Sequence, residues 1–299
     1  PYGEVQNPLL ADLVLQNYAW KQLLVEALET RTLPLWDPYL FSGHPFLANG
    51  QHSALYPLTW IFFVVPVARA YGIFVVLQLG LAGIWMYVLG RVMKAGPLGA
   101  LVSGIVFQFS GFMVVSVVHP MIIAGASWLP LLLALIECTV RRRRFWMRER
   151  AMLPWALLGA MALGLQILAG HLEITYFVLL VLAAFAGWRL LHGLLTAPRT
   201  AWRADVLSPA VGVVLMVGLG LVLGGVQLLP FYEVAADSFR QGAVTLQEVL
   251  GWAYPKRRVI TFLIPNFFGN PTHRAFTDLF SGELIRAGVN AYGQAVDVF

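Results

Sequence analysis

The stretch Pro209-Ala-Val-Gly-Val-Val-Leu-Met-Val-Gly-Leu-Gly-Leu-Val-Leu-Gly-Gly-Val-Gln-Leu-Leu-Pro230 runs for 22 residues without a charged side chain. A helix needs about 20 mostly apolar residues to cross the hydrocarbon core of a bilayer. This stretch therefore predicts a transmembrane helix. Five other stretches meet the same condition: 70–90, 97–118, 120–140, 152–170 and 173–191.

The composition agrees with a chain that lies mostly in lipid. Of its 299 residues, 59% are hydrophobic and 12% are charged, against roughly 25% charged in a soluble domain. We predict an all-α polytopic membrane protein, a helical bundle with six spans. A shorter apolar run, Pro57 to Ala68, is interrupted by Pro66 and Arg69. It is too short to span and predicts a re-entrant or interfacial half-helix.

Basic residues give the orientation, because short cytoplasmic loops are enriched in Lys and Arg. Loops 91–97, 141–150 and 189–208 hold two, six and three of them, 11 of the 20 in the chain. The intervening turns near His119 and Gly170 hold none. The alternation predicts that the three basic loops face the cytoplasm. Every Asp and Glu lies on the other side except for three residues: Glu137, Glu149 and Asp205.

The basic run 141–150 has two interpretations. One is a topology anchor that contacts anionic lipid. The other is nucleic-acid binding, for which the chain has no soluble domain to present the charges. The first is preferred, so no nucleic-acid partner is expected.

The predicted organisation has three parts: an extracytoplasmic loop at 1–57, a transmembrane bundle at 58–230 and an extracytoplasmic segment at 231–299. Within the first loop, the apolar residues at helical spacing predict an amphipathic helix over 13–28 on the membrane surface. Its proposed apolar face consists of Leu13, Trp20, Leu24, Ala27 and Leu28. The chain starts at Pro1 without a signal peptide, which predicts a fragment truncated at both ends.

Ionisable residues near the outer ends of the spans are the candidate site residues, because charges near lipid are costly and often functional. They are Asp12, Asp37, His171, Glu173, Glu233 and Asp237. Each has a plainer interpretation as a solvated charge or a helix cap, and for Asp12 a cap and a catalytic role stay equally open. Arg240 is the candidate cation for a phosphate group, ahead of the basic turn 256–258.

Five histidines could contribute to a metal site. They are His44, His52, His119, His171 and His273. Each is isolated in sequence, and no paired spacing typical of a zinc site is present. The spacing therefore gives little support for a metal site built from them.

An ordered series of motifs resembles the bacterial YfhO-like membrane proteins. In the first loop it comprises Asp12, Gln16-Asn-Tyr18, Leu33-Pro-Leu-Trp-Asp-Pro-Tyr39-Leu-Phe-Ser-Gly43-His-Pro-Phe46, Gln51 and Tyr56-Pro57. Later come Phe109-Ser-Gly-Phe112, Ala126-Ser-Trp-Leu-Pro130, Gly170-His-Leu-Glu173, Gln227-Leu-Leu-Pro230, Ser238-Phe-Arg240 and Ile264-Pro-Asn-Phe-Phe-Gly269. No single motif is decisive, but the order is kept over nearly the whole chain.

That family is similar to the C-type glycosyltransferases, which use sugars linked to polyprenyl phosphate. The resemblance implies an acidic catalytic residue shortly after a first span, in the first extracytoplasmic loop. Asp12 matches that place. It also implies a location in the bacterial cytoplasmic membrane, with a lipid-linked sugar donor and membrane lipids as partners.

Such a transfer needs few groups. A carboxylate takes the proton of the attacking hydroxyl. A cation, either an arginine or a divalent metal ion, stabilises the charge that grows on the leaving phosphate. Asp12 would be the base and Arg240 the cation, with Asp37 and Glu173 as competing acids.

Two other functions remain open from the sequence. A lipid or sugar transporter would carry ionisable groups in mid-span, whereas the large polar residues well inside the predicted spans are Gln108, Gln166 and Gln227. A non-catalytic subunit of a larger membrane complex is equally consistent with the sequence.

Overall fold

The computed structural model describes residues 12–40, 42–142, 144–145 and 151–238. Further along the chain it describes 245–251, 253, 256–264, 267, 275–277, 284–286, 288–289 and 295–296. Contacts divide the chain into two units, one holding 8–239 and the other holding 1–7 with 240–299. The predicted Arg240 lies outside the described residues.

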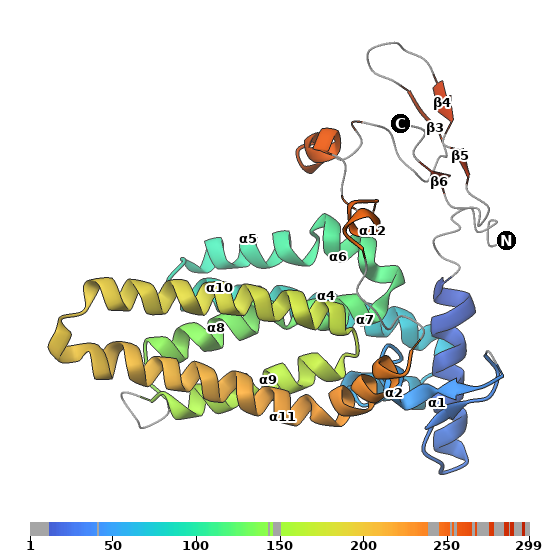
Figure 1. Cartoon of the computed structure of the whole chain (residues 1–299), viewed down its shortest axis with the longest axis horizontal. Helices are drawn as coiled ribbons and strands as arrows, with labels where there is room; N and C mark the ends of the chain where they lie inside the picture. The colour runs from blue at the N-terminus through green and yellow to red at the C-terminus, as the bar shows by residue number, and fades with distance from the viewer. Residues whose placement is uncertain are drawn as a thin grey trace. The chain divides into compact units, whose positions relative to one another are not determined.

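The first unit is a bundle of long apolar helices (Figure 1). Its helices are α4 (Val67–Val92), α5 (Pro97–Gln108), α6 (Gly111–Val115), α7 (Pro120–Ser127), α8 (Leu129–Val140), α9 (Leu153–Leu168), α10 (Leu172–Thr196) and α11 (Ser208–Ala236). Short turns of 3-10 or π-helix join them: η4 (Ser116–Val118), η5 (Arg199–Ala201) and η6 (Arg203–Leu207). By length and composition, five described helical segments could cross a membrane, so the chain is a multi-pass, mostly helical membrane protein.

The predicted spans coincide with these helices, with one difference in length. The segment predicted over 152–170 forms α9, which has 16 residues. It is shorter than each of the five helical segments that could cross a membrane. A helix of that length is roughly 24 Å long, below the roughly 30 Å of the hydrocarbon core. The number of spans therefore stays a prediction.

The two ends of the bundle differ in what they carry. Helices α4, α8 and α10 all finish at the left of Figure 1. We call this the basic end, because the arginine-rich loops that follow these helices begin there. The opposite end carries α1, α2 and the turns at His119 and Gly170, and we call it the first-loop end. The alternation predicted from the sequence is thus matched by the geometry of the bundle.

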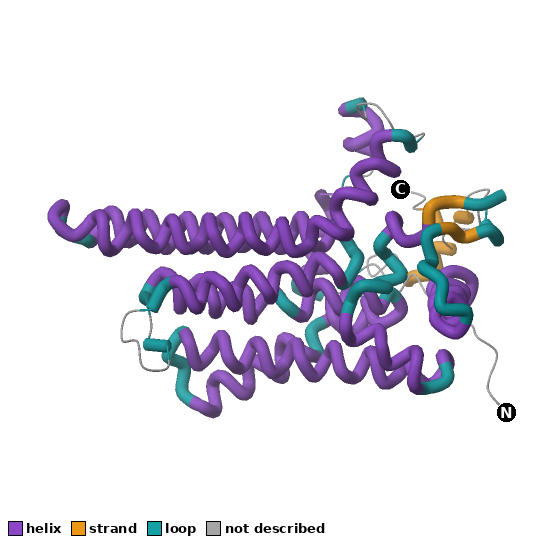
Figure 2. Tube along the Cα trace, turned by 90° about the horizontal axis from the view of Figure 1, so that it is seen from below, coloured by secondary structure: helices purple, strands orange, loops and turns teal. Residues whose placement is uncertain are grey.

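The amphipathic segment of the first loop is helical, as predicted. It begins with a π-helical stretch, η2 (Leu13–Tyr18), and continues as α1 (Ala19–Glu29). Helix α1 runs across the axes of the bundle helices, so that Figure 2 shows it nearly end-on. Trp20 and Leu24 are buried against Phe46 and Met121.

Of the proposed apolar face, α1 buries Trp20, Leu24 and Ala27. Leu28, at the last turn of the helix, is 53% exposed. Successive helical residues are about 100° apart, so Leu28 lies on the side of Leu24 but is not covered by the bundle.

After α1, the rest of the first loop consists of short strands and short helices. Strands β1 (Trp36–Asp37) and β2 (His44–Pro45) pair antiparallel, and α2 (Phe46–Asn49) follows directly. The run predicted as a half-helix forms η3 (Pro57–Trp60) and α3 (Ile61–Val64). It ends at Val65 and Pro66, because the extended backbone there breaks the helix. Arg69, which interrupts the apolar pattern, lies in the first turn of α4.

Glycines allow α9 and α11 to approach closely. A Cβ atom at Gly159 would lie 2.5 Å from the sulfur of Met216, and one at Gly220 would lie 2.7 Å from Leu163. Gly218 and Gly225 differ, because nothing lies within 4 Å of a Cβ built there. Close packing of these helices therefore uses only some of the glycines.

The second unit contains short elements that are described here by themselves. They are α12 (Leu246–Gly251), η7 (Lys256–Phe262), β3 (Ala275–Thr277), β4 (Leu284–Arg286), β5 (Gly288–Val289) and β6 (Ala295–Val296). Strand β3 pairs antiparallel with β4, and β5 with β6. The expected all-α architecture thus holds for the bundle, while small two-stranded pairs occur outside it.

Candidate functional site

Asp12 lies at the first-loop end, at the start of the helical segment that crosses the bundle. Its carboxylate Oδ2 is 3.6 Å from Nε2 of His119, the residue between η4 and α7. The Asp12 side chain is 66% exposed, so it is open to a reactant, and the His119 side chain is 32% exposed. The structure therefore joins an acid from the first loop to a histidine more than 100 residues later in the chain.

The alternative role of Asp12 as a helix N-cap is not seen. Its backbone is already helical, and its side chain accepts no capping hydrogen bond. Instead its carbonyl oxygen accepts a hydrogen bond from Asn17 at 3.2 Å. The carboxylate is consequently left free to face His119.

His171 lies within electrostatic reach of both His119 and Glu173. Burial lowers the pKa of His171, Glu173 opposes this shift, and His119 adds to it. His171 caps α10, because its Nδ1 accepts a hydrogen bond from the Ile174 N–H at 3.3 Å. It is therefore a neutral helix cap beside the Asp12–His119 pair, and Glu173 in the first turn of α10 suits the positive end of the helix dipole.

The other predicted acids stand apart from this pair. Asp37 is buried, and its Oδ1 accepts a hydrogen bond from the Tyr39 N–H at 2.8 Å, which is the turn-forming role its neighbours suggest. Glu233 and Asp237 are exposed at the end of α11. Among the described residues, no hydrogen bond or ion pair joins any of these three to Asp12.

Lys21 is a buried cation that the sequence interpretation overlooked. It lies on α1, only 3% exposed, and its ammonium group donates a hydrogen bond to the carbonyl oxygen of His52. The nitrogen also lies 4.8 Å from the centre of the Phe62 ring and 5.9 Å from that of Phe74. Burial lowers the pKa of Lys21 to about 7. Its place one turn before Leu24, on the buried side of the helix, was the signal available in the sequence.

His52 is also structural. Its Nε2 bonds the Phe46 carbonyl at 2.8 Å, and its Nδ1 accepts from the Ala54 N–H at 3.0 Å. Burial lowers its pKa to about 3, and the charge of Lys21 acts in the same direction. His52 is therefore neutral, with its proton on Nε2, and holds the first loop in shape rather than binding a metal.

A buried polar network lies beneath the first loop. The Tyr56 hydroxyl donates to Oε1 of Gln78 at 3.2 Å and accepts from the indole N–H of Trp128 at 3.1 Å. Ser127 donates to the same Gln78 oxygen at 3.3 Å. Burial raises the pKa of Tyr56 to about 12, so its hydroxyl keeps its proton and its donor role.

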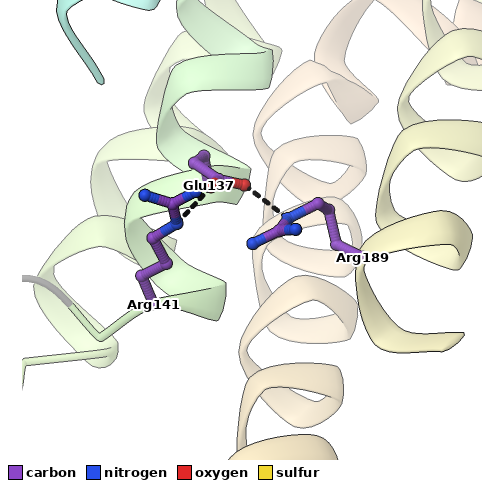
Figure 3. Close-up of polar contacts among 3 residues, drawn as sticks. All are labelled: Glu137, Arg141 and Arg189. Carbon is purple, nitrogen blue, oxygen red and sulfur yellow. Dashed lines mark hydrogen bonds and ion pairs between the residues drawn. The ribbon is translucent and has the colours of Figure 1, made fainter. Parts of the chain in front are cut away.

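Glu137 lies near the basic end of the bundle and is fully buried. Figure 3 shows it between two arginines. Its Oε2 accepts from Nε of Arg189 at 2.7 Å, across from α8 to α10, and its Oε1 pairs with Nε of Arg141 one turn later. A third arginine, Arg142, pairs with Asp205 at 2.7 Å. Two of the three acids on the basic side are thus matched by loop arginines.

A metal site is not formed by the described residues. Within that part of the chain, no three His, Cys, Asp or Glu side chains group closely enough to hold an ion.

Comparisons of the chain with protein-family models, with curated proteins and with solved structures give no match.

Proposed function

We propose that the chain is the membrane part of a glycosyltransferase that moves a sugar from a polyprenyl-phosphate donor to an acceptor. The observation that carries the proposal is the exposed Asp12 carboxylate facing His119, at the end of the bundle away from the arginine-rich loops. The proposed orientation places loops 91–97, 141–150 and 189–208 in the cytoplasm, by the excess of basic residues in them. The site then faces the extracytoplasmic side of a bacterial cytoplasmic membrane.

In this proposal the bundle has the C-type glycosyltransferase architecture, with α9 as a sixth span. Local thinning of the bilayer and snorkelling of flanking residues allow a short apolar helix to be accommodated in a bilayer. The lipid donor reaches the site sideways from the membrane. The acceptor reaches it from water, because Asp12 is exposed.

The reaction is a single displacement. The acceptor oxygen attacks the anomeric carbon while Asp12 takes its proton. The bond from that carbon to the phosphate oxygen breaks, and the polyprenyl phosphate leaves with the electron pair. His119 faces the carboxylate at 3.6 Å and, when it is protonated, orients the carboxylate by its charge. Arg240 remains the predicted cation for the departing phosphate.

The test replaces Asp12 by Asn in the full-length protein, with a labelled polyprenyl-phosphate sugar supplied in membranes. We expect transfer to fall by about 10²–10⁴-fold, because the amide is no longer a base, while the donor still binds. Glu26→Gln is the matched control: Glu26 is an exposed acid on α1, and its replacement should leave transfer unchanged. Normal transfer by Asp12→Asn would sink the assignment and favour the non-catalytic subunit.

A further inference from the structure

A lateral groove opens on the bundle between α10 and α11, with α8 at its floor. Its volume is about 520 Å³, and every residue lining it is apolar: Ile136, Leu179, Leu182, Ala183, Ala186, Val213, Val214, Val217, Gly218 and Leu221. Ile136, Leu182 and Ala186 are buried, whereas Val214 on the rim is 70% exposed. The groove is therefore deep at α8 and open sideways, in the part of the molecule that spans the membrane.

One end of the groove meets the arginine pair on Glu137. On α10, Leu179, Leu182, Ala186 and Arg189 follow at spacings of three and four, so they share one helix face. Arg189 lies about 4.5 Å along the axis beyond Ala186. On α8, Glu137 directly follows Ile136 of the groove floor. The apolar channel thus runs into a polar end near the basic loops.

Among the described residues, the charge around Glu137 is not balanced. Arg141 and Arg189 both reach the single carboxylate of Glu137, which leaves one positive charge in excess. Each arginine uses its Nε for that contact, and its terminal Nη groups have no partner among the described residues. Partly buried cations without a counter-charge are costly, and guanidinium Nη groups match phosphate oxygens well.

We propose that this groove binds one acyl chain of an anionic bilayer phospholipid, whose phosphate is held by Arg141 and Arg189. The charge excess decides the occupant. A neutral lipid, or another apolar helix, would fill the groove but leave the extra cation without a partner. The site lies in the half of the bundle toward the basic end, so it is separate from the Asp12–His119 pair.

The first test concerns binding of the acyl chain, and it fills the groove with a larger side chain. Gly218→Leu places a side chain in the groove without a clash, since nothing lies within 4 Å of a Cβ there. Gly225→Leu is the matched control on the same helix, equally open and outside the groove lining. The full-length protein is purified in neutral detergent, and retained lipid is counted by native mass spectrometry after addition of phosphatidylglycerol or phosphatidylcholine.

We expect the wild type and Gly225→Leu to retain one phosphatidylglycerol, and Gly218→Leu to retain about tenfold less. Equal retention by the two glycine variants would overturn the proposal. So would equal retention of phosphatidylglycerol and phosphatidylcholine by the wild type, since the site would then not select an anion.

The headgroup half is tested with Arg141→Gln. This change removes the excess charge and leaves the Glu137–Arg189 pair between α8 and α10 in place. Arg91→Gln is the control, because Arg91 is exposed near the same end, donates to the Ala95 carbonyl and lies outside the groove lining. Arg141→Gln should lose the preference for phosphatidylglycerol by about tenfold while Arg91→Gln keeps it. Identical preferences in the two variants would exclude the arginine-bound phosphate.

Discussion

At the scale of single residues, the first-loop end contains two kinds of titratable group. Asp12 and His119 are partly exposed and face each other, so they are available to a reactant. Lys21 and His52 are buried, and their pKa values are lowered by burial. The first pair suits proton transfer. The second pair stabilises the fold of the first loop, with His52 neutral and Lys21 a weaker base than an exposed lysine.

The role of His119 gives a prediction that rests on the proposed function. His119→Phe removes the group that faces the Asp12 carboxylate, and we expect kcat for sugar transfer to fall about 10- to 100-fold with little change in KM for the donor. His192→Phe is the control, because His192 is exposed on α10, five residues before its C-cap. Equal kcat values for the two variants would remove His119 from the site.

Lys21 predicts a pH dependence of stability. In the unfolded chain a lysine keeps its proton up to about pH 10.5, whereas buried Lys21 loses it near pH 7. Between these values the unfolded state binds more protons, so the free energy of unfolding rises with pH, by a few kcal/mol in all. Below pH 7 both states are protonated and this contribution is constant.

Thermal unfolding in detergent between pH 7 and 10 measures the effect. Lys21→Met should flatten the rise in Tm, whereas Lys94→Met, at an exposed lysine, should retain it. A wild-type Tm that falls with pH over this range, relative to Lys21→Met, would contradict the assignment.

At the scale of elements, hydrogen bonds from side chains to backbone carbonyls attach the first loop to the bundle. The Ser53 hydroxyl donates to the Ala169 carbonyl at 2.7 Å, and the Gln227 amide donates to the carbonyls of Leu47 and Ala48 at 3.2 and 3.3 Å. The turn after α2 is thus bonded to the C-terminal end of α9, and α2 itself is bonded to α11. The loop that carries the site is positioned by the rigid helices below it.

Gly170 is where this contact is tightest. Its φ is +90°, and a Cβ atom there would lie 2.0 Å from the Gly50 carbonyl oxygen. Gly170→Ala should therefore lower the free energy of unfolding by about 2–4 kcal/mol, from strain and a backbone clash. The measurement is Tm of the purified protein.

Gly187→Ala provides the contrast within α10, since nothing lies within 4 Å of a Cβ there. A helical alanine should raise stability by about 0.5–1 kcal/mol relative to glycine. Similar Tm values for the two variants would show that the loop yields easily at Gly170.

At the scale of the whole molecule, the bundle separates two chemical environments. The basic end holds the buried Glu137 with Arg141 and Arg189, together with the Arg142–Asp205 pair. The first-loop end holds Asp12, His119, His171 and Glu173. Unequal distribution of arginine between the ends is what orients a membrane protein during insertion.

Orientation is tested by cysteine labelling. Ser42→Cys and Thr200→Cys place exposed thiols in the first loop and in the loop before α11, while native Cys138 is buried. In intact cells, an impermeant thiol reagent should label position 42 and reach position 200 only after permeabilisation. Labelling of both positions without permeabilisation would refute the alternation of loops.

The sequence by itself determined the bundle, because long uncharged stretches have few stable arrangements other than membrane helices. Five of the predicted segments meet the length and composition of a span, and the crossing helix of the first loop follows from its 3.6-residue periodicity. The surroundings of single side chains are less well determined by periodicity, since Leu28 on the predicted apolar face is 53% exposed.

Only the tertiary structure decided which distant residues meet. Asp12 and His119 are separated by more than 100 residues, and nothing in their local spacing indicates the contact. The same holds for the contact of Lys21 with the His52 carbonyl, for the two arginines on Glu137 and for the open groove at Gly218. Periodicity along the chain specifies which face of a helix is apolar, whereas the partner of that face depends on how the helices pack together.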